Sequence, residues 1–305
     1  MSSAEQFEWG PALPFEEWRE TYEALHMWTQ VVGKVKLDKN PLVNHWWHVP
    51  LYVSARGLTT GAMNEGGRVF QIDFDFIDHE LIVSDSDGRS LSFDLTRVGS
   101  VADFYASVKS RLDELRIWTN IWTTPVEVAN PVPFEQDEKP RHYNPEHANR
   151  FWRVLSRADF AMQVFRSAFI GKCSPVHFFR GSVDLAVTRC SGRPAPQHPG
   201  TPGVADSITR EAYSHEVSSA GFWPGGPALP EPIFYSYAYP EPEGFKDARV
   251  STPRAYYNKD FGEFILPYEA VRTSETYLND LLQFFNETYE AAANLGKWDR
   301  AALER

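Results

Sequence analysis

The order of apolar and polar residues divides the chain into helix-like and strand-like segments. Over residues 14–32 apolar side chains recur every three or four positions, which predicts a helix that ends at Gly33. Residues 69–76 alternate between apolar and polar side chains, which predicts a strand with one buried face. The pair Asp87-Gly88 lies between two short apolar runs and predicts a hairpin.

The same patterns continue along the rest of the chain. We expect extended segments at 46–58, 81–84, 90–95, 117–128, 183–189, 208–218, 233–239 and 263–266, and helices at 101–115, 145–170 and 274–295. Residues 130–144 are polar and contain three prolines, so we interpret them as a linker. The chain is then divided into a first α+β unit at 1–129 and a second at 145–305, either separate or fused into one globule.

The two halves also share an order of elements and a pair of short motifs. Gly-Lys at 33–34 precedes His-Trp-Trp at 45–47, and Gly-Lys at 171–172 precedes His-Phe-Phe at 177–179. In each half a helix comes first, antiparallel strands follow, and a helix closes the unit. We therefore predict an α+β fold made of two diverged copies of a helix–antiparallel-strands–helix unit, with helices covering the sheets.

Charge and composition narrow the classes of partner. With 30 basic and 41 acidic residues the chain carries a formal net charge of −11. A protein that binds phosphate backbones needs clustered Lys and Arg, and no such stripe is present, so we expect no nucleic-acid partner. No run of about 18 apolar residues occurs, so we expect no membrane partner. The first residues lack the features of a signal peptide, which favours the cytoplasm.

The two cysteines do not form a recognisable motif. Cys173 and Cys190 fit neither a zinc spacing nor a disulfide framework. We expect reduced, buried thiols, and a disulfide between neighbouring strands is the alternative. Phosphate-binding loops, dinucleotide fingerprints and the G-x-S-x-G motif of hydrolases are also absent from the sequence.

Candidate chemistry begins with two histidines ahead of an aromatic run. His45 and His48 are three residues apart, and on a helix they would share one face and could bind a metal together. The apolar run that follows favours a strand, on which the two side chains point to opposite faces. A metal-binding pair and two hydrogen-bonded histidines at a strand entrance both remain open.

Two later segments carry polar side chains in strand-like patterns. In residues 183–189, Asp184 lies opposite the apolar face, where it would line a cavity or face solvent. In residues 208–218, Glu211, Tyr213 and His215 share one face of an extended chain, an arrangement suited to acid–base chemistry or ligand contact. A hydrogen-bond network that fixes the register of a sheet would give the same pattern.

These residues together suggest a small-molecule site, binding or catalytic, at the junction of the two units. The catalytic candidates are His215, Glu211 and Asp184, and the ligand-binding candidates are His45, Trp47, His48, His177, Phe179, Arg189, Tyr213 and Trp223, with Trp46, Phe178 and Phe222 completing the walls. One alternative is a metal-dependent hydrolase that uses His45, His48 and His215 with a carboxylate. Another is an interaction protein whose aromatic residues only fill the core. The pattern specifies no cofactor and no oligomeric state, and it leaves open whether the protein is an enzyme.

Several segments resemble those of an uncharacterised bacterial family, a domain of unknown function. The resemblance rests on VNHWWHVPLYVSARGLTT at 43–60, GKCSPVHFFRGSVDLAVTRCSGRPAPQHPG at 171–200 and REAYSHEVSSAGFWPGG at 210–226, with FILPYEAVRT at 264–273 and WDRAALER at 298–305. It extends over nearly the whole chain. The family has no assigned activity, so the resemblance implies a bacterial cytoplasmic protein but supplies no catalytic residues.

Overall fold

The computed structural model describes residues 9–305, in which the chain forms seven α-helices and two antiparallel sheets of six strands each. The predicted α+β class is therefore confirmed. The helices are α1 (Phe15–Lys39), α2 (Val101–Glu114), α3 (Pro145–Ser167), α4 (Asp206–Ala212), α5 (Tyr268–Arg272), α6 (Tyr277–Leu295) and α7 (Arg300–Leu303).

The N-terminal sheet is a meander with the order β1-β2-β4-β5-β6, and β3 pairs with β4. Its strands are β1 (Tyr52–Val53), β2 (Gly57–Thr59), β3 (Met63–Glu65), β4 (Arg68–Asp75), β5 (Glu80–Asp85) and β6 (Ser90–Asp94). The alternation predicted for β4 is confirmed, because Phe70, Ile72 and Phe74 are buried while Gln71 is exposed. The predicted hairpin joins β5 to β6, and Gly88 has a positive φ of 81° there.

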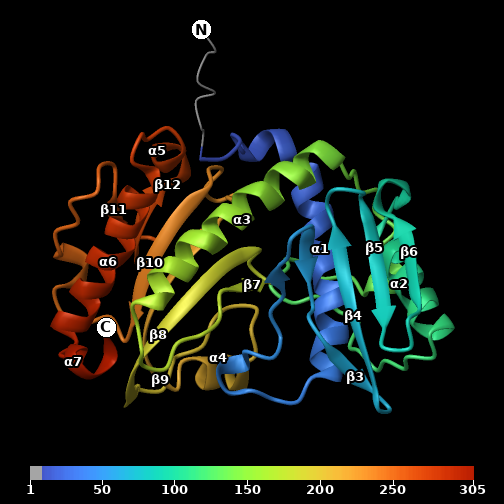
Figure 1. The fold of residues 1–305 in the computed structure, drawn as a ribbon, viewed down its shortest axis with the longest axis horizontal. Coiled ribbons are helices and arrows are strands. Elements are labelled where there is room, and N and C mark those ends of the chain that lie inside the picture. The colour runs from blue at the N-terminus through green and yellow to red at the C-terminus, as the bar shows by residue number, and fades with distance from the viewer. Residues whose placement is uncertain (1–8) are drawn as a thin grey trace, which may run out of the picture.

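The C-terminal sheet has the order β11-β12-β10-β9-β8-β7. Its strands are β7 (His177–Phe179), β8 (Asp184–Pro194), β9 (His215–Trp223), β10 (Ile233–Tyr239), β11 (Tyr256–Asn258) and β12 (Glu263–Pro267). Helices α3 and α6 lie in front of this sheet in Figure 1, whereas α1 and α2 lie behind the N-terminal sheet. The helices of the two halves therefore cover opposite sides of the molecule.

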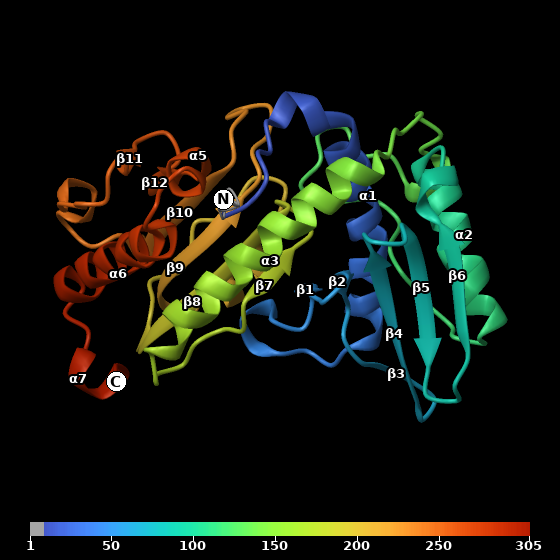
Figure 2. The ribbon, with the colours of Figure 1, turned by 45° about the horizontal axis from the view of Figure 1, so that its top comes forward.

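One hydrophobic core extends through both halves. Trp28 of α1 stacks on Phe104 of α2 with ring centroids 4.9 Å apart, and Trp18 packs on Phe151 of α3 at 4.8 Å. The two sheets are also joined, because Leu51 and Phe178 exchange two backbone hydrogen bonds of 2.9 and 2.8 Å. Figure 2 shows α3 running along the C-terminal sheet and reaching α1 at the centre of the molecule.

The segment interpreted as a linker packs against the first half. Phe134 is fully buried, and the backbone N–H of Ala102 donates to the carbonyl of Asp137 at 3.0 Å. The N–H of Arg141 donates to the carbonyl of Gly99 at 2.8 Å. Each half begins with a helix followed by a meander of strands, but the internal duplication and the boundary at 130–144 stay predictions.

The predicted end of the first helix is wrong, because α1 continues past Gly33 to Lys39. The structure gives a reason for a glycine inside the helix. The side chain of Arg180 crosses α1 at this position, and a Cβ on Gly33 would lie 2.1 Å from its Cδ atom. Gly33 is therefore a crossing point for a buried arginine and does not terminate the helix.

Three other predicted segments need correction. Residues 117–128 contain no strand, and residues 46–58 form only the short strands β1 and β2 after a 3₁₀ turn (Asn44–Trp46). Residues 208–218 are half helix and half strand, because α4 ends at Ala212 and β9 begins at His215. The N-terminus of α2 is capped by Ser100, whose hydroxyl accepts a hydrogen bond from the N–H of Asp103.

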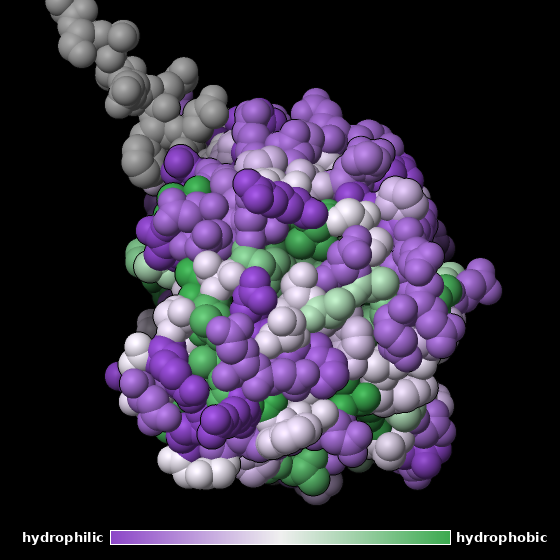
Figure 3. Space-filling view, turned by 90° about the vertical axis from the view of Figure 1, so that its right-hand side faces the viewer, coloured by the Kyte–Doolittle hydropathy of each residue, from purple (hydrophilic) through white to green (hydrophobic). Residues whose placement is uncertain are grey.

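The outer surface of the N-terminal half is mainly polar. Figure 3 shows the side of the molecule on which β5, β6 and α2 lie, where hydrophilic side chains predominate and apolar ones are scattered in small groups. Among residues 9–305, no helix combines the length and the apolar character needed to cross a lipid bilayer. Both cysteines are free thiols, Cys190 buried and Cys173 half-buried, which agrees with the expected reduced state.

Candidate functional site

The polar candidates gather on one face of the C-terminal sheet. Alternation along β8 turns Leu185 and Val187 toward the main core under α3. The opposite face carries Asp184, Ala186 and Thr188 of β8, Ser219, Gly221 and Trp223 of β9, Tyr235, Tyr237 and Tyr239 of β10, and Glu263 of β12. We call it the tyrosine face. A separate small hydrophobic cluster around Ala186, Tyr235 and Ile265 confirms that it is distinct from the main core.

Asp184 is the best-buried carboxyl of the tyrosine face. It accepts hydrogen bonds from the hydroxyls of Ser182 and Tyr235, and its residue is 8% exposed. Tyr235 reaches it from two strands away because Gly221, on the strand between them, has no side chain. A Cβ on Gly221 would lie 2.2 Å from the Tyr235 ring. Burial raises the pKa of Asp184, and the two hydroxyl donors partly oppose that rise.

Two further carboxyls lie close enough to Asp184 to interact with it electrostatically. Burial, together with the charge of Asp184, raises the pKa of Glu263 to about 7. Burial and the same charge raise the pKa of Glu127, against the opposing effect of Arg180. Within residues 9–305, Asp184 and Glu263 form no ion pair with a basic side chain. These two acids therefore lie partly or fully out of water without a counter-charge.

The loop between β8 and β9 crosses the tyrosine face. The hydroxyls of Tyr213 and Tyr237 are 2.8 Å apart, and the imidazole of His198 packs against Tyr213 and Tyr239 with centroids 4.6 and 4.7 Å apart. Tyr239 also donates a hydrogen bond to the carbonyl of Pro196 at 3.0 Å. Burial raises the pKa values of Tyr213 and Tyr237, so their phenols stay protonated at neutral pH. Aromatic rings and hydroxyls thus surround the acids on the side of this loop.

His177 adds a neutral imidazole on the neighbouring strand. His177 is on β7, opposite Ala186 of β8, and it lies diagonally next to Asp184 on the same face of the sheet. The residue is fully buried between Trp47, Tyr52 and Phe179, with ring centroids 6.1, 5.6 and 5.6 Å away. Neither ring nitrogen has a hydrogen-bond partner among the described residues. Burial, and then the charge of Lys36, lower its pKa to about 3, so the ring is uncharged.

A second group of predicted residues meets at the junction of the two halves. The Nδ1 atom of His45 lies 2.9 Å from the carbonyl of Ala212, and its Nε2 lies 2.6 Å from the Lys172 ammonium. The His215 ring is 5.5 Å from that of His45, and Trp47 packs on His45 at 4.9 Å. Burial lowers the pKa of His45, and the nearby Lys172 charge lowers it further. The imidazole is thus positioned as a neutral acceptor for the lysine.

Other predicted residues lie apart from these groups. Arg189 lies under α3 in the main core, where its guanidinium stacks 3.5 Å from the Phe165 ring centroid. Phe178 and Phe222 also belong to that core.

His48 is buried beside Trp46, and Glu211 is exposed on α4 instead of sharing a strand face with His215. Trp223 borders the tyrosine face and donates to the carbonyl of Ser182 at 3.1 Å.

The metal-dependent hydrolase loses its ligand set in this arrangement. His45 and His215 are neighbours, but His48 packs against Trp46, and its Nδ1 accepts a hydrogen bond from the backbone N–H of Val43 at 3.2 Å. Among the described residues, no three His, Cys, Asp or Glu side chains converge as metal ligands would. His45 is occupied by Lys172 instead.

Two tyrosines and a glutamate of the tyrosine face, and the nearby Glu127, were missed by the sequence interpretation. Tyr235 and Tyr237 lie on a strand whose bounds were predicted correctly as 233–239, and their spacing of two indicates a shared face. Glu263 begins a predicted strand, and an acid at the start of an apolar strand was a usable signal. Glu127 lies in a segment wrongly predicted as a strand, and nothing in its neighbourhood indicates a site.

Comparison with known proteins agrees with the expected resemblance. The model of a family described as "Family of unknown function (DUF5996)" matches residues 9–305, so the chain belongs to that family. No curated protein and no solved structure matches the chain.

Proposed function

We propose that this member of the DUF5996 family binds a small organic cation, a protonated or quaternary amine, on the tyrosine face. The proposal refines the expected small-molecule site by specifying the charge of the ligand. The observation that carries it is the pair Asp184 and Glu263, two desolvated carboxyls without a basic partner among the described residues. Such a pair lowers the stability of the free protein, and a ligand cation would relieve that cost.

The aromatic side chains favour a cation over other ligands. Tyr235 and Tyr237 stack at 6.2 Å between the two acids, and Tyr213 and Tyr239 approach from the side at 5.3 Å from each other. The faces of such rings attract cations, and each contact contributes about 0.5 to 2 kcal/mol depending on its desolvation. Neutral His177 would add a hydrogen-bond acceptor for an ammonium N–H, because its ring nitrogens have no partner among the described residues. Catalysis is not required by any of these contacts.

The proposal predicts a pH dependence of binding. A cation binds the ionised form of Glu263 in preference to the protonated form. With a pKa of about 7, that carboxyl is mostly protonated at pH 6 and mostly ionised at pH 8. Affinity for an amine that stays charged throughout is therefore expected to rise about tenfold between pH 6 and pH 8.

The test compares charged probes with uncharged analogues of the same shape. We would measure thermal shifts and calorimetric binding of choline against dimethylbutanol, and of butylamine against butanol, at pH 8. The expected result is binding of the charged member of each pair only. Asp184→Asn should weaken it about tenfold or more, because a charged acceptor is replaced by a neutral amide.

Asp159 supplies the matched control. It is a half-buried carboxyl of α3 whose pKa burial also raises, but it lies on a helix away from the tyrosine face. Asp159→Asn should leave amine binding unchanged. Equal binding of charged and uncharged probes, no binding of either, or equal loss in both Asn variants would overturn the proposal.

The cellular setting expected from the sequence also stays a proposal. We infer a bacterial cytoplasmic protein from the resemblance of its segments to an uncharacterised bacterial family.

A further inference from the structure

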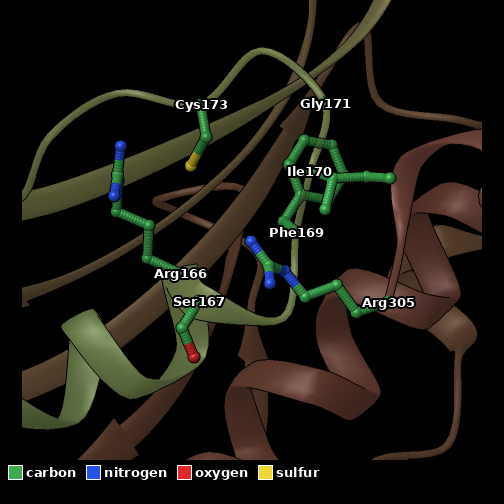
Figure 4. A pocket seen from close by; sticks show the side chains of 7 residues that line it. All are labelled: Arg166, Ser167, Phe169, Ile170, Gly171, Cys173 and Arg305. Atoms are coloured by element: carbon green, nitrogen blue, oxygen red, sulfur yellow. The ribbon is translucent and has the colours of Figure 1, made fainter.

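A cavity of about 660 Å³ lies at the C-terminal end of α3, away from the tyrosine face. Its lining is formed by Arg166, Ser167, Phe169, Ile170, Gly171, Cys173 and Arg305. Figure 4 shows the Arg305 guanidinium and the Cys173 sulfur pointing toward its centre, with the Arg166 side chain along the other side. The volume is in the range of pockets that hold small metabolites, about 300–1,000 Å³.

The charge of this cavity is opposite to that of the whole chain. Its lining contains two guanidinium groups and no carboxyl side chain, in a protein of net charge −11. Arg166 donates from Nε to the carbonyl of Ser174 at 2.6 Å, and neither it nor Arg305 forms an ion pair within residues 9–305. Both arginines therefore retain N–H donors for another partner.

A third arginine adds positive charge beneath the cavity. Arg189 is 2% exposed, pairs directly with Cys173 across a β-bridge, and has its guanidinium 5.1 Å from the centroid of Phe169. Its Nε has no hydrogen-bond partner among the described residues. The nearest acid, Glu304, is already bound by Arg300 and by the Tyr289 hydroxyl. At the end of α3, the Ala168 carbonyl accepts a hydrogen bond from the backbone N–H of Arg305 at 3.1 Å.

We propose that this cavity binds a small molecule that carries a carboxylate or phosphate group. The two guanidinium groups offer the planar donor pairs that oxyanions prefer. Phe169 and Ile170 form an apolar wall for the rest of the ligand. This site is independent of the amine site, since it shares no residue with it.

Cys173 provides a reporter inside the cavity. Cys190 is fully buried, so N-ethylmaleimide applied to the native protein should label Cys173 alone, and Cys173→Ser should abolish labelling. Phenyl phosphate at constant ionic strength is expected to slow labelling at least fivefold by occupying the cavity. Phenol, which lacks the oxyanion, should have no effect at the same concentration.

Arg305→Ala tests the charge without disturbing the core. The Arg305 side chain is exposed, and the backbone N–H that bonds Ala168 remains in the variant. The concentration of phenyl phosphate needed for half-protection should rise about tenfold in Arg305→Ala, as expected for loss of a charged hydrogen bond. Arg166→Lys, which keeps the charge but loses the planar fork, should show a smaller rise.

Arg249 supplies the control, because it is an exposed arginine in a distant loop. Arg249→Ala should match the unmodified protein in half-protection. Labelling that phenyl phosphate does not slow, protection by phenol to the same extent, or an equal change in Arg305→Ala and Arg249→Ala would overturn the anion site.

Discussion

At the scale of single residues, burial on the tyrosine face disfavours the ionised form of its carboxyl side chains. The Glu263 carboxyl has a folded pKa of about 7 against an ordinary value of 4.5. The folded state keeps this proton to a higher pH than the unfolded state does. The protonated carboxyl therefore makes its full contribution to the stability of the fold below pH 4.5. That contribution is lost as the pH rises toward 7.

Glu263→Gln should therefore flatten the dependence of stability on pH. Gln cannot ionise, so the free energy of unfolding of the variant should rise by about 1–3 kcal/mol relative to that of the unmodified protein between pH 5 and pH 8. This range includes the screening that solvent gives to a partly exposed group. Urea unfolding at the two pH values measures this difference. Glu243→Gln, at an exposed position, is the control and should follow the unmodified protein. Parallel pH profiles for all three proteins would contradict the burial of Glu263.

His177 is also a polar group buried at a cost to stability, but it is uncharged. Its two nitrogens are buried among aromatic rings without partners among the described residues, so the imidazole has lost its hydrogen bonds to water without replacement. His177→Leu keeps a similar volume and removes the unsatisfied groups. We expect it to raise the free energy of unfolding by about 1 kcal/mol while weakening amine binding. A loss of stability in urea unfolding would show that the imidazole contributes a favourable contact to the fold.

At the scale of elements, α1 tests whether a helix interior can require glycine. Gly→Ala inside a helix normally stabilises a protein by about 0.5–1 kcal/mol. At Gly33 we expect the opposite sign, a loss of about 1–3 kcal/mol, because the new Cβ would overlap the buried Arg180 side chain. Thermal or urea unfolding of Gly33→Ala measures the change directly.

A double-mutant cycle separates the overlap from helix propensity. In an Arg180→Ala background the crossing side chain is gone, so adding Gly33→Ala should stabilise α1 by the usual few tenths to 1 kcal/mol. The change of sign between the two backgrounds is the expected result. The same effect of Gly33→Ala in both backgrounds would mean that the helix, and not Arg180, decides the residue at this position.

The elements that the sequence predicted correctly are those fixed by local pattern. The alternation at 69–76, the strand at 233–239 and the hairpin at Asp87-Gly88 each depend on residues within a few positions of one another. Gly33 was misread because its reason, Arg180, lies 147 residues away, a difference of 180 − 33 in sequence position. The segment around Glu211 was misread because residues spaced two apart were taken for one strand, whereas Glu211 lies on α4 and His215 begins β9.

The candidate site was predicted only in part for a related reason. The side of the sheet on which Asp184 lies follows from alternation along β8, and that expectation agrees with the structure. Its partner Tyr235 depends on the strand order β8-β9-β10 and on the absence of a side chain at Gly221 between them. Neither condition is visible in the residues around Asp184. Contacts across strands are set by topology, which local pattern does not specify.

At the scale of the whole molecule, the two halves are joined more closely than two linked domains would be. The main core is one continuous cluster with residues from both halves, and Trp9, close to the start of the described chain, packs 5.6 Å from Phe234 of β10. Leu51 and Phe178 pair the edge of one sheet with the edge of the other. Separating the halves would therefore expose apolar surface from both.

We accordingly expect the protein to unfold in a single cooperative transition despite its 305 residues. Scanning calorimetry should give equal calorimetric and van't Hoff enthalpies, whereas two independent units would give a ratio near two or two separate peaks. Leu51→Pro removes the N–H that donates to Phe178, and should lower the one transition temperature without splitting the peak. A variant trace with one peak shifted and another unchanged would instead support independent units divided at residues 130–144. In that case the substitution would destabilise only the half that contains it and leave the other half unaffected.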